Sequence, residues 1–116
     1  MKHTVPLKEN HLFRRAYHRG RSAADSRLAL YVRGNGQKGS RLGLTVSTKV
    51  GCAVVRNRVR RRLREIYRLN EDRLAGGRDV VVVARVRAAS SDYRQLEKSF
   101  LRLSDKLGLL KKEGAK

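Results

Sequence analysis

Residues 54–68 read VVRNRVRRRLREIYR, and this stretch decides how the rest of the chain is interpreted. It holds seven arginines and one acidic residue. At about 100° per residue, its apolar side chains form one stripe, which consists of Val55, Val59, Leu63 and Ile66. Most of the arginines lie on the opposite side, whereas Arg58 and Arg62 border the apolar stripe. The spacing therefore predicts one helix with a buried face and a cationic face.

The charge of the whole chain indicates what this cationic face binds. The formal net charge is +19, and arginine supplies 20 of the 29 basic residues. A block of like charges repels itself unless an anionic partner neutralises it. The planar guanidinium suits bidentate phosphate contacts and stacking on bases, so the arginine bias favours nucleic acid. Membrane-surface helices pair such charge with a large apolar face that often bears tryptophan, which this chain lacks.

The length of 116 residues accommodates a single domain with one modest core. No apolar stretch approaches the roughly 20 residues that span a bilayer. The N-terminal MKHTVPLKEN does not resemble a signal peptide, so we expect a cytoplasmic protein with no membrane partner. One cysteine, Cys52, excludes an internal disulfide and a cysteine-based metal cluster.

Periodicity predicts the elements before the arginine-rich helix. Residues 8–19 place Leu12, Phe13, Ala16 and Tyr17 on one helical stripe, and Gly20 suits the end of that helix. Residues 28–32 and 41–47 alternate apolar and polar side chains, and the loop GNGQKGS between them favours a hairpin. On its second face, Tyr31 accompanies small or hydroxylated residues, namely Gly43, Thr45 and Ser47.

Two elements are predicted after Gly76-Gly77. Residues 79–86, DVVVVARV, are typical of a strand covered on both faces. Residues 90–107 predict a last helix behind a Ser or Asp cap, with an apolar side formed by Leu96, Phe100, Leu103 and Leu107. The sequence thus predicts an α+β sandwich with one sheet. We expect a flexible arm at residues 1–6, a domain at 7–110 and a flexible tail at 111–116.

The chain offers no convincing catalytic or metal site of its own. The ten acidic residues are scattered and look like local charge partners, whereas a two-metal nuclease needs converging carboxylates. His11 and His18 are seven residues apart, which is weak evidence for an acid–base pair in a metal-free ribonuclease. The loop GNGQKGS lacks the Lys-Ser/Thr ending of a phosphate-binding loop and is followed by no predicted helix. We therefore expect any chemistry to be performed by a partner.

Residues 43–67, GLTVSTKVGCAVVRNRVRRRLREIY, resemble the bacterial ribonuclease P protein family, whose signature includes the segment found here at Arg56, Asn57 and Arg58. The stretches LKENHLFRRAYHRG, LALYV and RDVVVVARVRA occur in the expected order and spacing, so the resemblance covers residues 7–107. It implies the order α-β-β-β-α-β-α, a four-stranded sheet and a left-handed βαβ crossover. The handedness differs from the right-handed default for a strand–helix–strand unit.

The resemblance also implies a function. Proteins of this family are small basic subunits of a holoenzyme whose catalytic RNA removes the 5′ leader of precursor tRNA with bound Mg²⁺. The expected partners are therefore the ribonuclease P RNA subunit and precursor tRNA, and the protein alone is expected to be a noncatalytic monomer. The charge by itself also allows a structural RNA-binding protein, such as a ribosomal or assembly factor.

The resemblance assigns two sets of site residues. The surface facing the catalytic RNA comprises Lys49, Arg56, Asn57, Arg58, Arg60, Arg61 and Arg64. The cleft that receives the single-stranded leader is lined by Phe13, Tyr17 and Tyr31. Two positions depart from the family pattern: Cys52 stands where Asn is usual, and Tyr17 stands where Phe is common. We assign no function to Cys52, whereas either ring at position 17 can stack on a base.

Overall fold

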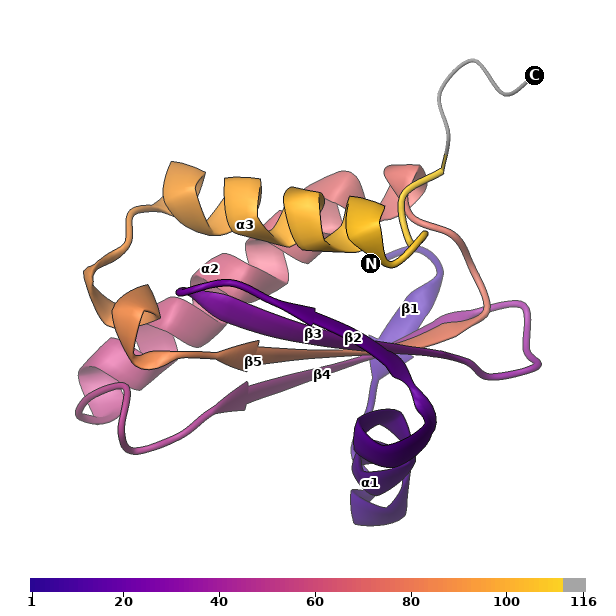
Figure 1. The fold of residues 1–116 in the computed structure, drawn as a ribbon, viewed down its shortest axis with the longest axis horizontal. Coiled ribbons are helices and arrows are strands. Elements are labelled where there is room, and N and C mark those ends of the chain that lie inside the picture. Colours follow the sequence, from indigo (N-terminus) through magenta and orange to yellow (C-terminus); the bar gives the residue numbers. More distant parts are fainter. Residues whose placement is uncertain (112–116) are drawn as a thin grey trace.

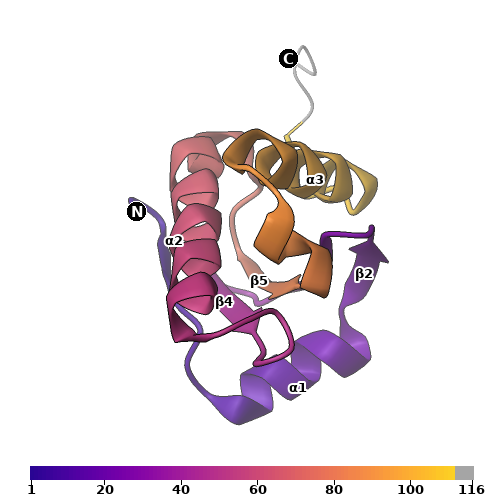
Figure 2. The same ribbon diagram turned by 90° about the vertical axis from the view of Figure 1, so that its left-hand side faces the viewer.

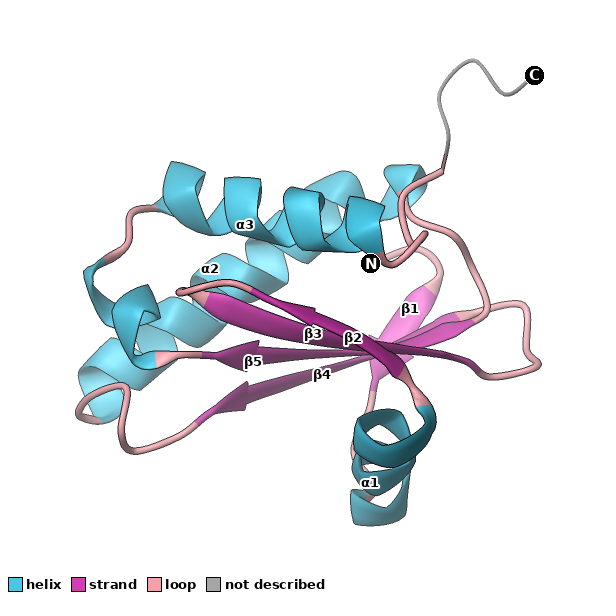
Figure 3. Cartoon of the chain, viewed as in Figure 1, coloured by secondary structure: helices cyan, strands magenta, loops and turns pink. Residues whose placement is uncertain are grey.

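The structure is a computed structural model, and it describes residues 1–111. Its elements follow the order β1 (Thr4–Pro6), α1 (Asn10–Arg19), β2 (Arg21–Ala24), β3 (Leu28–Gly34), β4 (Ser40–Val46), α2 (Ala53–Asn70), η1 (Glu71–Arg73), β5 (Arg78–Ala84), η2 (Val86–Ser90) and α3 (Tyr93–Lys106), where η marks a short 3₁₀ helix. All three predicted helices are present, and the first begins two residues later than expected (Figure 3).

One mixed sheet forms the middle layer of the fold. Its strand order is β1-β4-β5-β3-β2, in which β4 is parallel to both β1 and β5, and β3 is antiparallel to both β5 and β2. Helices α2 and α3 cover one face of the sheet, and α1 lies against the other (Figure 1). The predicted α+β sandwich is confirmed.

In the part of the chain that the structure describes, the sheet has five strands, so the prediction of four strands is wrong. The additional strand is β1, which lies in the segment predicted to be an arm outside the domain. It pairs in parallel with β4, and Ser40 N donates to His3 O at 2.9 Å while Leu7 N donates to Leu42 O at 2.8 Å. Pro6 is accepted there because β1 is an edge strand, where a missing N–H group leaves no gap in the ladder.

The predicted hairpin of β3 and β4 is also wrong, because β5 lies between these two strands. Val80, Val81 and Val82 of β5 are at most 1% exposed, as expected for a strand covered on both faces. The central position buries this apolar run more completely than an edge position would, so β5 displaces the local pairing of β3 with β4. The interior position predicted for this strand is confirmed.

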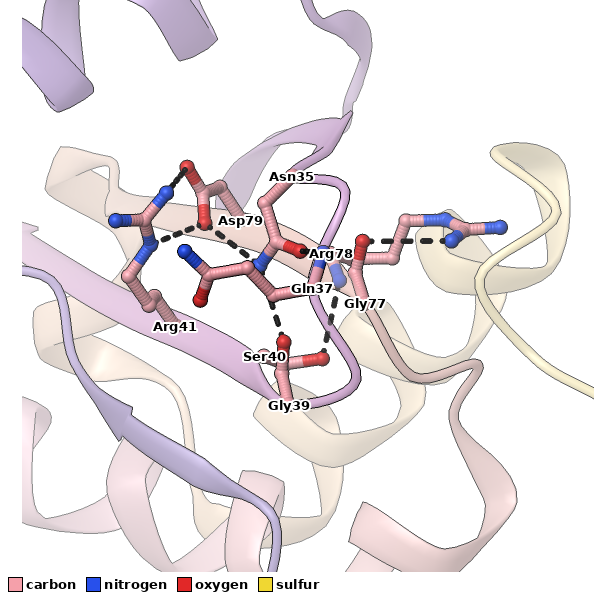
Figure 4. A network of polar contacts seen from close by, with 8 residues as sticks. All are labelled: Asn35, Gln37, Gly39, Ser40, Arg41, Gly77, Arg78 and Asp79. Carbon is pink, nitrogen blue, oxygen red and sulfur yellow. Dashed lines mark hydrogen bonds and ion pairs between the residues drawn. The ribbon is translucent and has the colours of Figure 1, made fainter.

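Polar contacts tie the β3–β4 connection to the start of β5 (Figure 4). Asp79 is 1% exposed and accepts hydrogen bonds from Arg41 Nε at 2.7 Å, Arg41 Nη2 at 3.0 Å and Asn35 Nδ2 at 3.2 Å. Gly77 has φ +70°, and a Cβ atom there would lie 2.6 Å from Gln37 O. The loop between β3 and β4 therefore crosses the entry to β5 at a distance that only glycine permits.

The connection from β4 through α2 to β5 is left-handed. The arrowheads of β4 and β5 point to the left in Figure 1, so both strands run toward the viewer in Figure 2. There β4 lies to the left of β5, and α2 is on the upper side of the sheet with α3. A path that rises from the left strand and descends to the right strand while advancing toward the viewer turns left-handed. The expectation from the family resemblance is thereby confirmed, against the general default.

The sheet separates two apolar clusters of unequal size. The larger cluster lies between the sheet and the helices α2 and α3, and it includes Leu63, Ile66, Leu96, Phe100 and Leu103. The smaller cluster, under α1, consists of Leu7, Leu12, Ala16 and Val81.

Local signals explain how two of the helices begin or end. Asp92 and Gln95 form a reciprocal capping box at the start of α3, where an Asp or Ser cap was predicted. Gly20 ends α1 with an extended backbone, and a Cβ atom there would lie 2.5 Å from Ala16 O, so glycine is required for close approach. The predicted C-terminal tail is described only at Lys111, whose N donates to Arg73 O at 2.8 Å. The rest of the predicted tail, 112–116, lies outside the described residues.

Candidate RNA-binding surfaces

The first candidate surface is the outer side of α2. Val59, Leu63 and Ile66 are buried against the sheet and Val55 is half-buried, so the predicted apolar stripe is confirmed. The opposite side carries a set that we call the arginine face, namely Arg56, Asn57, Arg60, Arg61 and Arg64. Asn57, Arg61 and Arg64 are exposed, whereas Arg56 and Arg60 are half-buried.

Internal contacts distinguish the members of the arginine face. Arg60 Nη1 donates to Asn57 Oδ1 at 3.0 Å. Within residues 1–111, no ion pair or side-chain hydrogen bond engages Arg61 or Arg64. Their guanidinium groups are therefore available for a phosphate, and this part of the predicted surface is the most accessible. Lys49, in the turn that precedes α2, is exposed as well.

Arg58 lies differently from the rest of its predicted set. It is half-buried, and its Nη2 approaches Ala89 O at 3.5 Å. Arg62 also turns toward this segment, where its Nη1 donates to Ser91 O at 3.1 Å. Both arginines thus border the apolar stripe, as the spacing predicted, and connect α2 to the segment before α3. Sequence reasoning did not assign Arg62 a structural contact, although its border position was the available signal.

Cys52 is exposed immediately before α2. The backbone N–H groups of Val55 and Val54 in the first turn, together with the nearby Arg56 charge, hold the pKa of the Cys52 thiol below its usual value.

The second candidate surface lies between α1 and the sheet. The ring centroids of Phe13 and Tyr17 are 6.4 Å apart, and those of Tyr17 and Tyr31 are 4.9 Å apart in an edge-to-face arrangement. Tyr17 Oη and Thr45 Oγ1 are 3.2 Å apart, so a hydrogen bond joins α1 to β4. The structure therefore brings together all three aromatic residues predicted from the resemblance. We call this surface the aromatic groove.

Strand register explains how the aromatic residues pack against the sheet. Tyr31, Val81 and Gly43 lie side by side in β3, β5 and β4, and so share the face of the sheet that α1 covers. A Cβ atom at Gly43 would lie 2.6 Å from the Phe13 ring, so glycine lets this ring rest directly on the backbone of β4. The open space is about 520 Å³, and its lining consists of Asn10, Phe13, Arg14, Tyr17 and Thr45.

Asn10 and Arg14 were not predicted as members of this groove. Their spacing relative to Phe13 and Tyr17, at positions i, i+3, i+4 and i+7 of one helix, was the signal that could have found them. Arg14 is exposed and places a cation beside the aromatic rings, where a nucleotide backbone would need one.

The two histidines of α1 do not form a pair. Seven residues of α-helix separate His11 from His18 by about 10 Å along the axis, and His11 Nδ1 lies 3.3 Å from Glu9 Oε2. Within residues 1–111, no three His, Cys, Asp or Glu side chains gather in a way that could hold a metal ion.

The acidic residues instead serve the fold. Asp25 pairs with Arg102 of α3 at 2.6 Å, and Asp79 holds Arg41. Glu65 Oε2 accepts from Arg68 Nε at 3.1 Å, and this hydrogen bond lowers the pKa of Glu65. These contacts confirm the interpretation of such acids as local charge partners.

Within residues 1–111, no helix combines the length and apolarity needed to cross a membrane.

Comparisons with known proteins identify the family of the chain. The family model described as "Ribonuclease P" matches residues 1–108. The ribonuclease P protein component of Natranaerobius thermophilus is 43% identical over 112 residues, covering 97% of each chain. That of Alkaliphilus metalliredigens is 42% identical over 104 residues, covering 90% of this chain and 94% of the relative.

Solved structures show the same fold. The ribonuclease P protein of Staphylococcus aureus superposes with a TM-score of 0.84 at 28% identity, covering 94% of this chain and 98% of that one. The ribonuclease P protein of Thermotoga maritima gives a TM-score of 0.76 at 30% identity, covering 84% of this chain and 92% of that one. On the evidence of family model, relatives and fold together, the chain belongs to the family of bacterial ribonuclease P proteins.

Proposed function

We propose that this ribonuclease P protein binds the catalytic RNA subunit through the arginine face and the 5′ leader of precursor tRNA through the aromatic groove. Hydrolysis is assigned to the RNA subunit, and the protein increases its activity by holding both RNAs. The observation that best supports this proposal is that a cationic helix face and a set of clustered aromatic rings lie on opposite sides of one sheet.

The arginine face suits a structured RNA with closely spaced phosphates. Arg61 and Arg64 project from one rigid helix that Val59, Leu63 and Ile66 hold to the core, so little backbone freedom is lost on binding. Each neutralised phosphate releases counterions, which makes the affinity fall steeply with salt. Lys49 and Arg56 extend this surface toward the first turn of α2, and Arg58 contributes at its border.

The aromatic groove suits unpaired nucleotides. Aromatic side chains stack on any base, and each such contact contributes about 1–3 kcal/mol. Tyr17 is 38% exposed, so a ring edge is available to solvent before any RNA binds. Because stacking depends little on base identity, this groove would accept the varied leader sequences of different precursor tRNAs.

Magnesium is assigned to the RNA subunit. Mg²⁺ prefers oxygen ligands in octahedral geometry and is typically held by carboxylates together with phosphates. The carboxylates of Asp25, Glu65 and Asp79 are already engaged with arginines, so they do not fit a protein magnesium site. We further propose that the protein alone is a monomer and that it functions in the cytoplasm.

The test is reconstitution with a ribonuclease P RNA at low magnesium concentration. We expect the protein to raise the rate of leader removal from precursor tRNA, whereas the protein without RNA should cleave nothing. Tight RNA binding with no gain in cleavage would instead support a structural RNA-binding role. Cleavage by the protein alone, with loss of that activity in His11→Ala, would support an autonomous ribonuclease.

A further inference from the structure

A third surface, which we call the arm groove, lies between β1 and α2. Its volume is about 490 Å³, and because residues of α2 line it, it lies on the face of the sheet opposite α1 and the aromatic groove. The side formed by the strands includes Pro6, Leu42 and Leu44. The side formed by α2 includes Arg60, Arg61, Arg64, Glu65 and Arg68. An apolar floor therefore meets a cationic wall.

The strand register shows how this floor arises. Pro6 is paired with Leu42, so both side chains lie on the same face of the sheet. Leu42 belongs to the large apolar cluster under α2, and Leu44 packs against that cluster. Pro6 extends this apolar surface beyond the edge of β4, and it remains exposed. The floor is thus a continuation of the core, and its exposed part is at Pro6.

The N-terminal arm, residues 1–6, forms the side of the arm groove opposite α2, and specific contacts hold it in place. Glu71, 7% exposed, accepts hydrogen bonds from Lys2 N at 2.8 Å and His3 N at 3.1 Å. Burial works to raise the pKa of Glu71, but hydrogen bonds from Thr4 and from these two backbone groups outweigh it and keep the pKa below its usual value. Thr4 Oγ1 also lies 3.2 Å from Tyr67 Oη. The contacts that hold the arm therefore join residues that are 63 to 69 positions apart in sequence.

The cations beside the floor differ in availability. Arg68 is paired with Glu65, and Arg60 donates to Asn57. Arg61 and Arg64 have no such partner within residues 1–111 and lie on the turn of α2 that faces the arm. A ligand that matches this arrangement has a flat apolar part and an adjacent anion. A nucleotide has both features, in its base and its phosphate.

We propose that the arm groove receives one unpaired nucleotide of the RNA subunit. The base lies against Pro6 and Leu44, and its flanking phosphates contact Arg61 and Arg64. RNA is the occupant because the groove is continuous with the arginine face through the same two arginines, and its volume is in the range of small-ligand sites. This inference rests on the proposed binding of the RNA subunit and adds to it a specific point of contact.

The main test fills the groove without changing charge. In Pro6→Trp, an exposed edge residue is replaced by a large ring that occupies the floor. The matched control is Val86→Trp, since Val86 is 61% exposed and lies outside the groove. We expect Pro6→Trp to weaken binding to the RNA subunit by about tenfold, as when one base loses its contact surface, with an unchanged salt slope. Wild-type affinity in Pro6→Trp would overturn the proposal.

Chemical probing identifies the nucleotide. Reagents that acylate the ribose 2′-OH react with flexible unpaired nucleotides whatever their base, and the proposal immobilises one such nucleotide in the groove. At saturating protein, wild type and Val86→Trp should change the reactivity of a nucleotide that Pro6→Trp leaves unchanged. Identical reactivity patterns for all three proteins would overturn the proposal.

A second pair of variants tests the arm without touching the floor. Glu71→Ala releases Lys2 and His3, whereas Asp72→Ala removes the same charge from an exposed neighbour in η1. Loss of a negative charge alone should strengthen RNA binding in both variants. We expect Glu71→Ala to weaken it several-fold and Asp72→Ala to leave it equal or stronger. Equal behaviour of the two variants would contradict the proposal, and this pair decides the question if Pro6→Trp does not fold.

The failure of this inference is distinguishable from that of the proposed function. If wild-type protein does not stimulate precursor-tRNA cleavage, the proposed function fails whatever the variants do. If wild type stimulates cleavage and Pro6→Trp binds the RNA subunit equally well, only the arm groove is wrongly assigned.

Discussion

The two faces of the sheet are built in opposite ways. Among residues 1–111, the face under α2 and α3 buries 20 apolar residues in one cluster, whereas the face under α1 buries four. One short helix cannot cover five strands, so aromatic side chains on the α1 face remain open to solvent. The difference teaches that stability and the proposed leader binding depend on opposite faces of the sheet. The face under α2 and α3, which we call the thick face, holds the fold and presents arginines on its outer side. The face under α1, which we call the thin face, leaves room for a ligand.

The largest expected effect is the loss of stability when a side chain is removed from the thick face. Phe100 is 1% exposed and packs edge-to-face on Tyr67 at 6.1 Å. Phe100→Ala should lower the free energy of unfolding by about 3–5 kcal/mol. Leu12→Ala, on the thin face, should cost about 2 kcal/mol, because its surroundings can relax toward solvent. Urea unfolding of the two variants measures the difference, and equal losses would contradict the contrast between the faces.

The next effect concerns the acid sensitivity of the thick face, where Asp25 connects the β2–β3 turn to α3. Burial works to raise the pKa of Asp25, but hydrogen bonds from Leu28 N, Arg27 N and Arg102 outweigh it and lower the pKa from 3.8 to about 2. A depressed pKa stabilises the fold above pH 4, and this contribution of about 2 kcal/mol is lost as the pH falls from 4 to 2. Asp25→Ala should remove it at neutral pH.

Urea unfolding between pH 5 and pH 2.5 measures this contribution. The wild-type protein should lose more stability over that range than Asp25→Ala does. Asp105→Ala, which removes an exposed carboxylate from α3, serves as the control and should behave like wild type. Parallel pH profiles for wild type and Asp25→Ala would show that the hydrogen bonds to the Asp25 carboxylate contribute nothing to stability.

A third effect should appear only in binding. Tyr31→Ala removes a ring of the aromatic groove but no residue of the large cluster, so stability should change little. Its affinity for leader-bearing precursor tRNA should fall by about 2 kcal/mol, and that for mature tRNA should not change. Tyr31→Phe keeps the ring and should bind as wild type. Equal losses for the two tRNA ligands would place the leader elsewhere.

The smallest expected effect concerns the outer side of α2. Arg61→Ala should reduce the salt slope of binding to the RNA subunit by about 0.7–0.9, the change expected for one lost phosphate contact. Stability should stay at the wild-type value because Arg61 is exposed. Arg94→Ala, which removes an exposed arginine from α3, is the matched control. An unchanged slope in Arg61→Ala would place this residue outside the interface.

Much of this organisation was predictable from local patterns. The apolar stripe of α2, the capping residues of α3 and the valine run of β5 each depend on residues near one another in sequence. The same holds for the arginine face, whose exposure follows from the 3.6-residue period. The clustering of Phe13, Tyr17 and Tyr31 was predicted with the help of the family resemblance, because helix spacing could not relate α1 to β3.

The errors share one physical cause, which is pairing between distant segments. A short loop between β3 and β4 favoured a hairpin, but the gain from burying Val80, Val81 and Val82 on both faces places β5 between them. Likewise, nothing near Thr4–Pro6 indicated a strand, since its partner Ser40–Leu42 and its anchor Glu71 are remote in sequence.

The sequence by itself determined the helices, the central strand, the cationic helix face and the family. These depend on composition and on periods of two or 3.6 residues, which are local properties of the chain. Only the tertiary structure decided the strand order, the fifth strand, the packing of the Phe13 ring on Gly43 and the arm groove between β1 and α2. Each of these results from competition among distant segments for the same buried surface, which no local pattern encodes.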